Sequence, residues 1–187
     1  MYYKTDSHWS QDKITNVSNI LLSEMNNTVY EQTFDINLVD NFKGVYLSQA
    51  CVPIKKDVIK YLTNDAIKNA IVYNYETNSE TKVYDLEKLT DDKSLDNYDI
   101  FLSGASSLLK ITNKNSKTNK TLIMFRDSYG SSLAPLFIDN YKEIYMIDLR
   151  YINSKLISNY ININGDEDVL FIYSTTLINI PNNFKIN

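Results

Sequence analysis

The sequence is short of cysteine, glycine and proline, and it contains a single histidine. Cys51 is the only thiol, which excludes an intrachain disulfide and a CxxC metal site. The four glycines form no phosphate-binding loop, which argues against a nucleotide cofactor. One histidine with scattered carboxylates is no ligand set for a metal. We therefore expect no metal and no other cofactor.

The chain also lacks a long apolar run and an excess of positive charge. No apolar stretch reaches the about 18 residues that a membrane-spanning helix needs. The net charge of −4 argues against binding to a phosphate backbone, so we expect no nucleic-acid partner. The first residues lack the basic and apolar regions of a signal peptide. If the protein is exported, its targeting segment lies outside this chain.

The length and the composition indicate one domain over residues 1–187. A chain of 187 residues with 43% apolar content can bury one core. Neither an internal repeat nor a Pro/Gly/Ser-rich linker divides it. Asn, Lys, Ile and Tyr are abundant, as codon bias in an AT-rich genome would produce. The 15 tyrosines would also suit a surface that contacts sugars, but composition alone does not show one.

The last third of the chain predicts strands that alternate with helices. Near-continuous apolar runs predict buried strands, and helical periodicity predicts a helix after each of the first two. The strands are expected at residues 120–125, 144–147 and 169–173, and the helices at 131–141 and 152–160. This alternation predicts an α/β fold with a mostly parallel, doubly wound sheet.

The first two thirds are predicted to begin with a helix and to continue with antiparallel strands. Apolar residues recur at helical spacing from Ile14 to Met25, with Ser10 or Asp12 as the N-cap and Asn26–Asn27 as the end. Alternation over residues 29–52, with a turn at 41–44, predicts a hairpin. Further strands are expected at 67–75 and 81–86, and a short helix at 94–101. The middle third is therefore expected to form an antiparallel insertion or edge.

A candidate nucleophile lies where the first late strand passes into its helix. Ligands of open parallel sheets bind beyond the carboxyl ends of the strands, and Ser128 is placed there. Unpaired backbone N–H groups at a helix start can stabilise an oxyanion. Gly130 shares this turn and is a further candidate for oxyanion or substrate binding. Taken alone, the turn is better explained by Ser128 or Asp127 acting as a helix cap.

A serine nucleophile needs a base, and His8 is the one histidine in the chain. Asp6 lies two residues before it, so in an extended segment both side chains point the same way. The carboxylate can then hold the imidazole, with Trp9 packed behind it. A lone histidine beside a tryptophan is often structural. The combination with Ser128 makes Ser128, His8 and Asp6 a candidate triad.

Four segments together resemble the SGNH-hydrolase-like proteins that include the DHHW family and the alginate O-acetyltransferases. The segment Thr5-Asp6-Ser7-His8-Trp9 resembles their TD-x-HW motif. The other three segments resemble the nucleophile block, the end of the next strand and the closing strand, at residues 121–136, 147–151 and 168–173. The resemblance implies an SGNH-like (flavodoxin-like) three-layer sandwich. It also implies Ser128 as nucleophile, His8 as general base and Asp6 as orienting acid.

The resemblance implies further site residues and shows departures from the family pattern. Gly104 and Ser106 lie where the family tends to have Gly-Gly-Asn for the oxyanion hole, but Ala105 has no amide to donate. Arg150 is expected to hold an anionic or carbonyl group, although an exposed arginine at a strand end is an equal explanation. Ser7 replaces the first His of DHHW. Only four residues precede the motif, which predicts a domain truncated at its N-terminus.

The function expected from this resemblance is a serine-dependent carbohydrate esterase or polysaccharide O-acetyltransferase. Its partner would be a carbohydrate or acyl-ester substrate, with a membrane-bound acyl-donor partner if it is a transferase. Its place would be extracytoplasmic, at the surface of a bacterium or secreted. The alternative is a non-catalytic cell-surface or glycan-binding domain that keeps the scaffold. A third hypothesis is a subunit whose partner supplies a missing strand, and the oligomeric state stays open.

Overall fold

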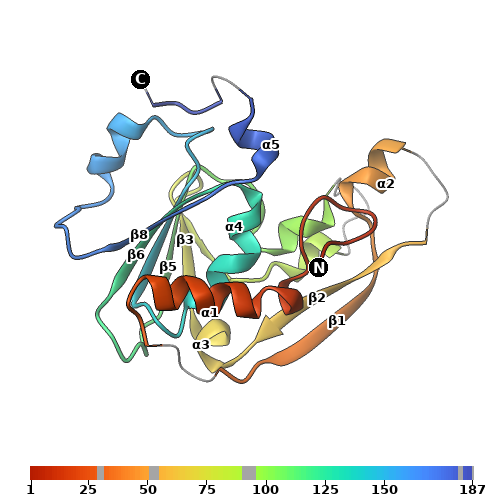
Figure 1. Ribbon diagram of the computed structural model, residues 1–187, viewed down its shortest axis with the longest axis horizontal. Helices are drawn as coiled ribbons and strands as arrows, with labels where there is room; N and C mark the ends of the chain where they lie inside the picture. Colours follow the sequence, from red (N-terminus) through yellow and green to blue (C-terminus); the bar gives the residue numbers. More distant parts are fainter. Residues whose placement is uncertain (29–31, 51–54, 90–95, 181–182, 187) are drawn as a thin grey trace.

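A six-stranded mixed sheet forms the centre of the protein (Figure 1). The computed structural model describes residues 1–28, 32–50, 55–89, 96–180 and 183–186. The strands follow the order β4-β3-β5-β7-β6-β8. Their bounds are β3 Ile71–Asn74, β4 Ser79–Thr81, β5 Leu108–Thr112, β6 Thr121–Arg126, β7 Glu143–Ile147 and β8 Asp168–Ile172. The α/β class predicted from the sequence is thus confirmed.

The three late strands form the parallel half of this sheet. The central strand β6 pairs in parallel with β7 on one side and with β8 on the other. The apolar runs correctly located all three strands. The prediction that each is buried on both faces is wrong for β8, because β8 is the edge strand. Val169 and Phe171 on its open face are 47% and 65% exposed.

The middle third continues the same sheet in antiparallel fashion. Strand β5 pairs antiparallel with β7 and with β3, and β3 pairs antiparallel with β4. The sheet is therefore mixed rather than mostly parallel. A helix lies where the predicted strand 67–75 begins, since α3 covers Asp65–Asn69 and Asn64 caps it through Ile67 N–H. Of the predicted strand 81–86, only residue 81 lies in β4.

The predicted hairpin exists, but its second strand lies elsewhere. Strand β1 (Asp35–Phe42) pairs antiparallel with β2 (Asp57–Thr63), outside the main sheet. The segment expected to return, Val45–Ala50, is helix α2. This segment starts by contacting the N-terminal loop, because Tyr46 N–H donates to the Thr5 carbonyl over 3.0 Å. The outermost positions of the prediction, residues 29 and 51–52, lie outside the described residues.

The helix predicted near the N-terminus is confirmed as α1 (Thr15–Glu24). A 3-10 turn, η1 (Gln11–Lys13), precedes it, so Ile14 rather than Ser10 or Asp12 stands at its N-cap. Asn26 ends it with a φ of 53°. The helix expected at 131–141 begins earlier, as α4 (Ser128–Leu133). It then tightens into η4 (Ala134–Phe137) at Pro135, which cannot donate a helical hydrogen bond.

The remaining helical elements are short. The segment predicted as a helix at 152–160 is the 3-10 helix η5, and the one at 94–101 is a single 3-10 turn, η3. Their bounds are η5 Ser154–Asn159, η3 Asn97–Ile100, η2 Leu86–Leu89 and α5 Thr175–Ile178. Residues 94 and 95 lie outside the described residues. No helix in the described parts of the chain is long and apolar enough to cross a membrane.

Apolar side chains cover both faces of the sheet. On one face, Met124 and Met146 pack with residues of α1 and α4, including Leu22 and Leu133. On the other face, Ile123 packs in a second cluster with Ile152, Ile157 and Ile161 around η5. Figure 1 shows α4 beside the strands and α1 running across their lower part. Strand β6 thus contributes side chains to both apolar clusters.

Candidate active site

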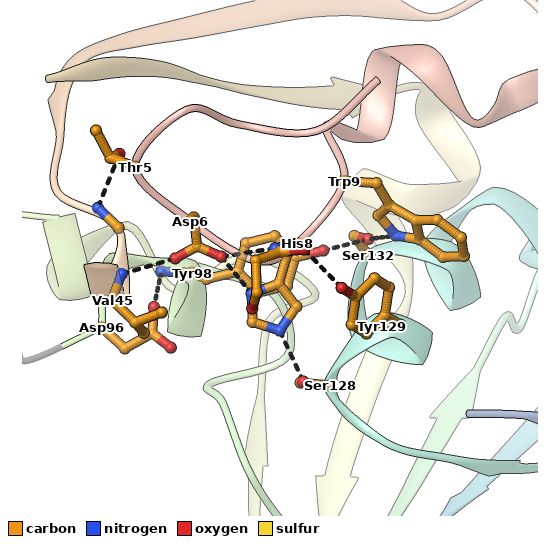
Figure 2. Close-up of polar contacts among 12 residues, drawn as sticks. Thr5, Asp6, His8, Trp9, Val45, Asp96, Tyr98, Ser128, Tyr129 and Ser132 are labelled. Carbon is orange, nitrogen blue, oxygen red and sulfur yellow. Dashed lines mark hydrogen bonds and ion pairs between the residues drawn. The ribbon is translucent and has the colours of Figure 1, made fainter. Parts of the chain in front are cut away.

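The structure brings Asp6, His8 and Ser128 into one hydrogen-bonded chain (Figure 2). The Nδ1 atom of His8 lies 2.5 Å from Asp6 Oδ1. The Nε2 atom of the same ring lies 2.7 Å from Ser128 Oγ, although 120 residues separate the two in sequence. Asp6 and His8 are both buried. These distances are those of a base poised on a serine hydroxyl and oriented by a carboxylate.

The N-terminal loop that carries Asp6 and His8 is tied down by contacts with the β1–β2 hairpin and α2. The carboxylate of Asp57 accepts hydrogen bonds of 2.8 Å from Lys4 N–H, Thr5 N–H and the Thr5 hydroxyl. Gly44 packs directly on Thr5, since a Cβ at Gly44 would lie 2.1 Å from the Thr5 carbonyl oxygen. A side chain at Gly44 would therefore displace the loop that presents His8.

The carboxylate of Asp6 is held in its ionised form. Burial by itself raises its pKa, but the hydrogen bond and charge of the His8 ring and the two backbone N–H donors outweigh burial and lower it. Those donors are His8 N–H and Val45 N–H, each at 2.9 Å. An ionised carboxylate beside Nδ1 favours the tautomer with its proton on Nδ1. The Nε2 atom is then free to accept the Ser128 proton.

Asp127 fixes the turn that presents Ser128. Its Oδ1 accepts the Tyr129 N–H over 3.0 Å at the start of α4, and its Oδ2 accepts the Ser174 N–H over 2.7 Å. Asp127 thus braces α4 and the segment after β8. Ser128 is the first residue of α4, where a backbone N–H has no acceptor within the helix. Gly130 instead gives its N–H to the Asp127 carbonyl over 3.1 Å and packs on Arg126.

Two tyrosines that sequence reasoning missed, Tyr98 and Tyr129, lie against the His8 imidazole. The Tyr98 ring stacks on His8 with 3.9 Å between centroids and 7° between planes. Its hydroxyl donates to Ser132 Oγ over 2.6 Å, and Trp9 Nε1 donates to the same oxygen over 2.8 Å. Tyr129 caps the loop by donating its hydroxyl to the Ser7 carbonyl. Tyr98 comes from η3, far from both motifs in sequence, so no local signal marked it.

A small pocket of about 130 Å³ opens beside Ser128 and His8. Gly104, Ala105 and Arg150 lie in its wall, as do the acidic and aromatic residues Asp96, Asp99, Tyr98, Phe101 and Tyr151, together with Ser131. Ser106 and Gly130, both predicted for this site, do not line it. The Ser106 hydroxyl points instead to Glu76 Oε2, at 3.2 Å. A larger hollow of about 580 Å³ lies elsewhere and contains none of the predicted site residues.

One carboxyl group in the pocket, that of Asp99, has a raised pKa. Burial, followed by repulsion from Asp96, raises the pKa of Asp99 to about 6. Asp99 packs against Gly104, where a Cβ would lie 2.5 Å from its Oδ1. Gly104 has a φ of 89°, a conformation that glycine adopts most readily. Any pH dependence of this pocket therefore includes the Asp99 carboxyl group.

Arg150 reaches the pocket wall while remaining paired with Asp148. Its Nη2 and Nε atoms donate to the buried Asp148 carboxylate over 2.6 Å and 2.9 Å. This hydrogen bonding raises the pKa of Arg150. The guanidinium is thus oriented by a fixed partner, and its side chain keeps 26% of its surface exposed. Among the described residues, no group of three or more His, Cys, Asp or Glu side chains is placed to hold a metal ion.

Comparison with known proteins identifies the fold through solved structures. No family model matches the chain, and none of the curated proteins matches it by sequence. A DHHW family protein from Eubacterium siraeum superposes with a TM-score of 0.70 and 22% identity, over 92% of this chain and 58% of its own. Bacillus cereus PatB1 with a sulfonyl adduct gives a TM-score of 0.68 and 18% identity, over 93% and 60%.

A second structure of Bacillus cereus PatB1 gives a TM-score of 0.68 and 16% identity, over 94% of this chain and 63% of the other. The chain thus corresponds to less than two thirds of the length of each of these proteins. The identities are low, so the likeness is one of fold. The expected resemblance to the DHHW family is confirmed at that level. The chain shares the α/β fold of the DHHW family protein and of PatB1.

Proposed function

We propose that the protein is a serine-dependent acyl-ester enzyme in which Ser128, His8 and Asp6 act as the catalytic triad. The observation that carries this proposal is the continuous chain of hydrogen bonds from Asp6 through His8 to Ser128 Oγ. The SGNH-like fold is consistent with it. The serine lies at a helix start beyond the carboxyl end of a parallel strand, where open α/β sheets bind ligands.

In the first half-reaction, His8 Nε2 takes the Ser128 proton while Oγ bonds to the ester carbonyl carbon. The resulting tetrahedral oxyanion collapses by breaking the ester C–O bond, and the leaving alcohol receives the proton from His8. In the second half-reaction, water or a sugar hydroxyl gives its proton to His8 and attacks the acyl-enzyme. Ser128 leaves and recovers its proton. Water makes the enzyme an esterase, and a sugar hydroxyl makes it an O-acyltransferase.

Of the oxyanion donors expected from the sequence, the two glycine N–H groups are already engaged in the structure. Gly104 N–H and Gly130 N–H donate to the carbonyls of Phe101 and Asp127, so neither is free for a substrate oxygen. Ala105 has no side-chain amide. We assign the oxyanion to Ser128 N–H at the start of α4 and to Arg150, whose oriented guanidinium lines the pocket.

The pocket volume of about 130 Å³ suits a short acyl chain better than a long one. We extend the proposal to a carbohydrate ester as substrate, an extracytoplasmic place of action and, for a transferase, a membrane-bound acyl-donor partner.

A glycan-binding domain without turnover is the second candidate. Ala105 favours it, because this residue supplies no amide donor to an oxyanion hole.

Covalent labelling tests the proposed nucleophile. Phenylmethanesulfonyl fluoride should form one adduct, on Ser128, as its Oγ displaces fluoride after losing its proton to His8. A sulfonyl adduct has been seen in PatB1. Intact-mass and peptide mass spectrometry locate the adduct. The neighbouring Ser131 and Ser132 serve as internal controls within the same peptide. An unlabelled Ser128, or labelling spread equally over these serines, would contradict the proposal.

A further inference from the structure

The arginines of this chain are placed unusually. Only two of its 19 basic residues are arginines, Arg126 and Arg150, and all the others are lysines. Both arginines converge on the buried carboxylate of Asp148. Arg150 binds it with two donors, and Arg126 Nη1 lies 4.0 Å from Asp148 Oδ2. The chain uses lysine at every other basic position and arginine only in this cluster beside Ser128. This choice indicates that the cluster needs the planar set of N–H donors that a guanidinium offers and an ammonium group lacks.

Arg126 lies beneath the pocket without reaching it. Its side chain is fully buried, with 0% exposure. Nη1 donates to Ser131 Oγ over 3.3 Å and to the Asp127 carbonyl over 3.5 Å, on either side of Ser128. Nη2 donates to the Ser106 carbonyl over 3.4 Å, in the loop that carries Gly104 and Ala105. One guanidinium therefore spans the two segments that enclose the reacting serine.

The backbone around this guanidinium is shaped to admit it. A Cβ at Gly130 would lie 2.6 Å from Arg126 Cβ, so the first turn of α4 can rest on the arginine stem only with glycine there. Beyond the Ser106 carbonyl, the Ser107 carbonyl accepts the Asp148 N–H over 2.9 Å. The loop, Asp148 and the nucleophile turn thus meet at Arg126.

Stability alone is a poor reason to keep this charge buried. Taking a guanidinium out of water costs several kcal/mol, which only good hydrogen bonds and a close counter-ion offset. Here the three hydrogen bonds are long, Asp148 Oδ2 is 4.0 Å away, and Arg126 Nε has no hydrogen-bond partner among the described residues. An apolar residue of similar volume would fill the space at lower cost. The arginine is better explained by what it holds in place.

We propose that Arg126 is a positioning residue for the proposed acyl-transfer reaction. Its guanidinium sets the spacing between the Ser128 turn and the Gly104–Ser107 loop, and through Asp148 it sets the direction of Arg150. The pocket wall that faces the developing oxyanion is thereby fixed relative to Oγ. This inference rests on the proposed function and assigns to it a residue that contacts no substrate.

The test compares the kcat of Arg126→Lys with that of the wild type, each divided by the number of active sites in which Ser128 is still reactive. Lysine keeps the charge but offers a single nitrogen, which cannot span three acceptors on two segments. Titration with phenylmethanesulfonyl fluoride counts the sites in which Ser128 is still reactive. We expect kcat for p-nitrophenyl acetate, divided by that count, to fall about 30- to 100-fold, which is a loss typical of weakened oxyanion stabilisation. KM should change by less than about threefold, and the shape of the pH–rate profile should stay that of the wild type.

A core variant provides the matched control. Leu22→Ala empties part of the α1 interface, far from these contacts, and lowers the melting temperature without touching the pocket. Its kcat per titrated site should equal that of the wild type. A normal kcat per titrated site in Arg126→Lys would mean that the residue is merely structural, and this outcome overturns the inference.

Hydrogen exchange gives a readout that does not depend on turnover. The Asp148 N–H donates to the Ser107 carbonyl, and its hydrogen exchange should be faster in Arg126→Lys than in Leu22→Ala. Each variant is measured at the same number of degrees below its own melting temperature. If the wild type shows no Ser128-dependent turnover, the proposed function fails while this comparison still decides the positioning claim. Equal Asp148 exchange in the two variants would overturn that claim.

Discussion

Replacing Ser128 with alanine is expected to reduce ester hydrolysis roughly 10⁴- to 10⁶-fold, the loss seen when a triad nucleophile is removed. The reason is that Ser128 Oγ lies 2.7 Å from the proposed base and no other hydroxyl has that contact in the described structure. Initial rates of p-nitrophenyl acetate hydrolysis measure the effect. Ser116→Ala, the same chemical change in a distant loop, is the control and should keep the wild-type rate.

The same variant separates the enzyme from a glycan-binding domain. Binding of a polysaccharide to Ser128→Ala should persist in either case, because losing one hydroxyl leaves the pocket wall intact. A wild-type protein that binds the glycan yet hydrolyses esters no faster than Ser128→Ala would be the binding domain. Retention of most activity in Ser128→Ala would remove Ser128 from the mechanism altogether.

Asp6→Asn is expected to lower kcat about 10⁴-fold while leaving the fold intact, as the equivalent change does in other triads. The asparagine amide can donate to Nδ1, which moves the ring proton to Nε2. Ser128 then faces a donor instead of a base. Stopped-flow or steady-state kinetics with p-nitrophenyl acetate measure kcat, and circular dichroism checks the fold.

The acid response of stability provides a second readout for Asp6. Its pKa is lowered in the folded protein, chiefly by contacts with His8 that outweigh burial. A lowered pKa contributes stability above the unfolded value, and this contribution disappears as pH falls through the folded value. The wild type should therefore lose more stability on acidification than Asp6→Asn. Asp35→Asn, in an exposed pair with Lys68, is the control and should behave like the wild type in both assays.

Local sequence features predicted the parts of the site that depend on few residues. The two-residue spacing of Asp6 and His8 placed their side chains together, and the strand-to-helix turn placed Ser128 at the start of α4. Both features follow from backbone geometry over two to four residues, so no tertiary information is needed. The buried runs located β6 and β7 for the same reason, since a strand covered on both faces must be apolar throughout.

Features set by distant contacts could not be predicted in this way. Tyr98 stacks on His8 only because η3 packs beside the N-terminal loop. Val45 starts a helix rather than a strand, and its N–H donates there to Asp6 Oδ2, 39 residues away in sequence. Arg126 reads in sequence as the first residue of the turn after a strand, and its role emerges only when the Ser106 carbonyl lies beside it. Each of these depends on pairs of residues far apart along the chain.

The central claim, that His8 activates Ser128, is tested most directly by the pH dependence of p-nitrophenyl acetate hydrolysis from about pH 5 to about pH 9. We expect the wild-type rate to rise with pH, because only a neutral imidazole can accept the Ser128 proton, and the His8→Ala rate to stay at background throughout. Asp99→Asn is the necessary control, because Asp99 also titrates in the pocket, with a pKa of about 6. It should keep the rise, whereas a rise that survives in His8→Ala and vanishes in Asp99→Asn would contradict the account.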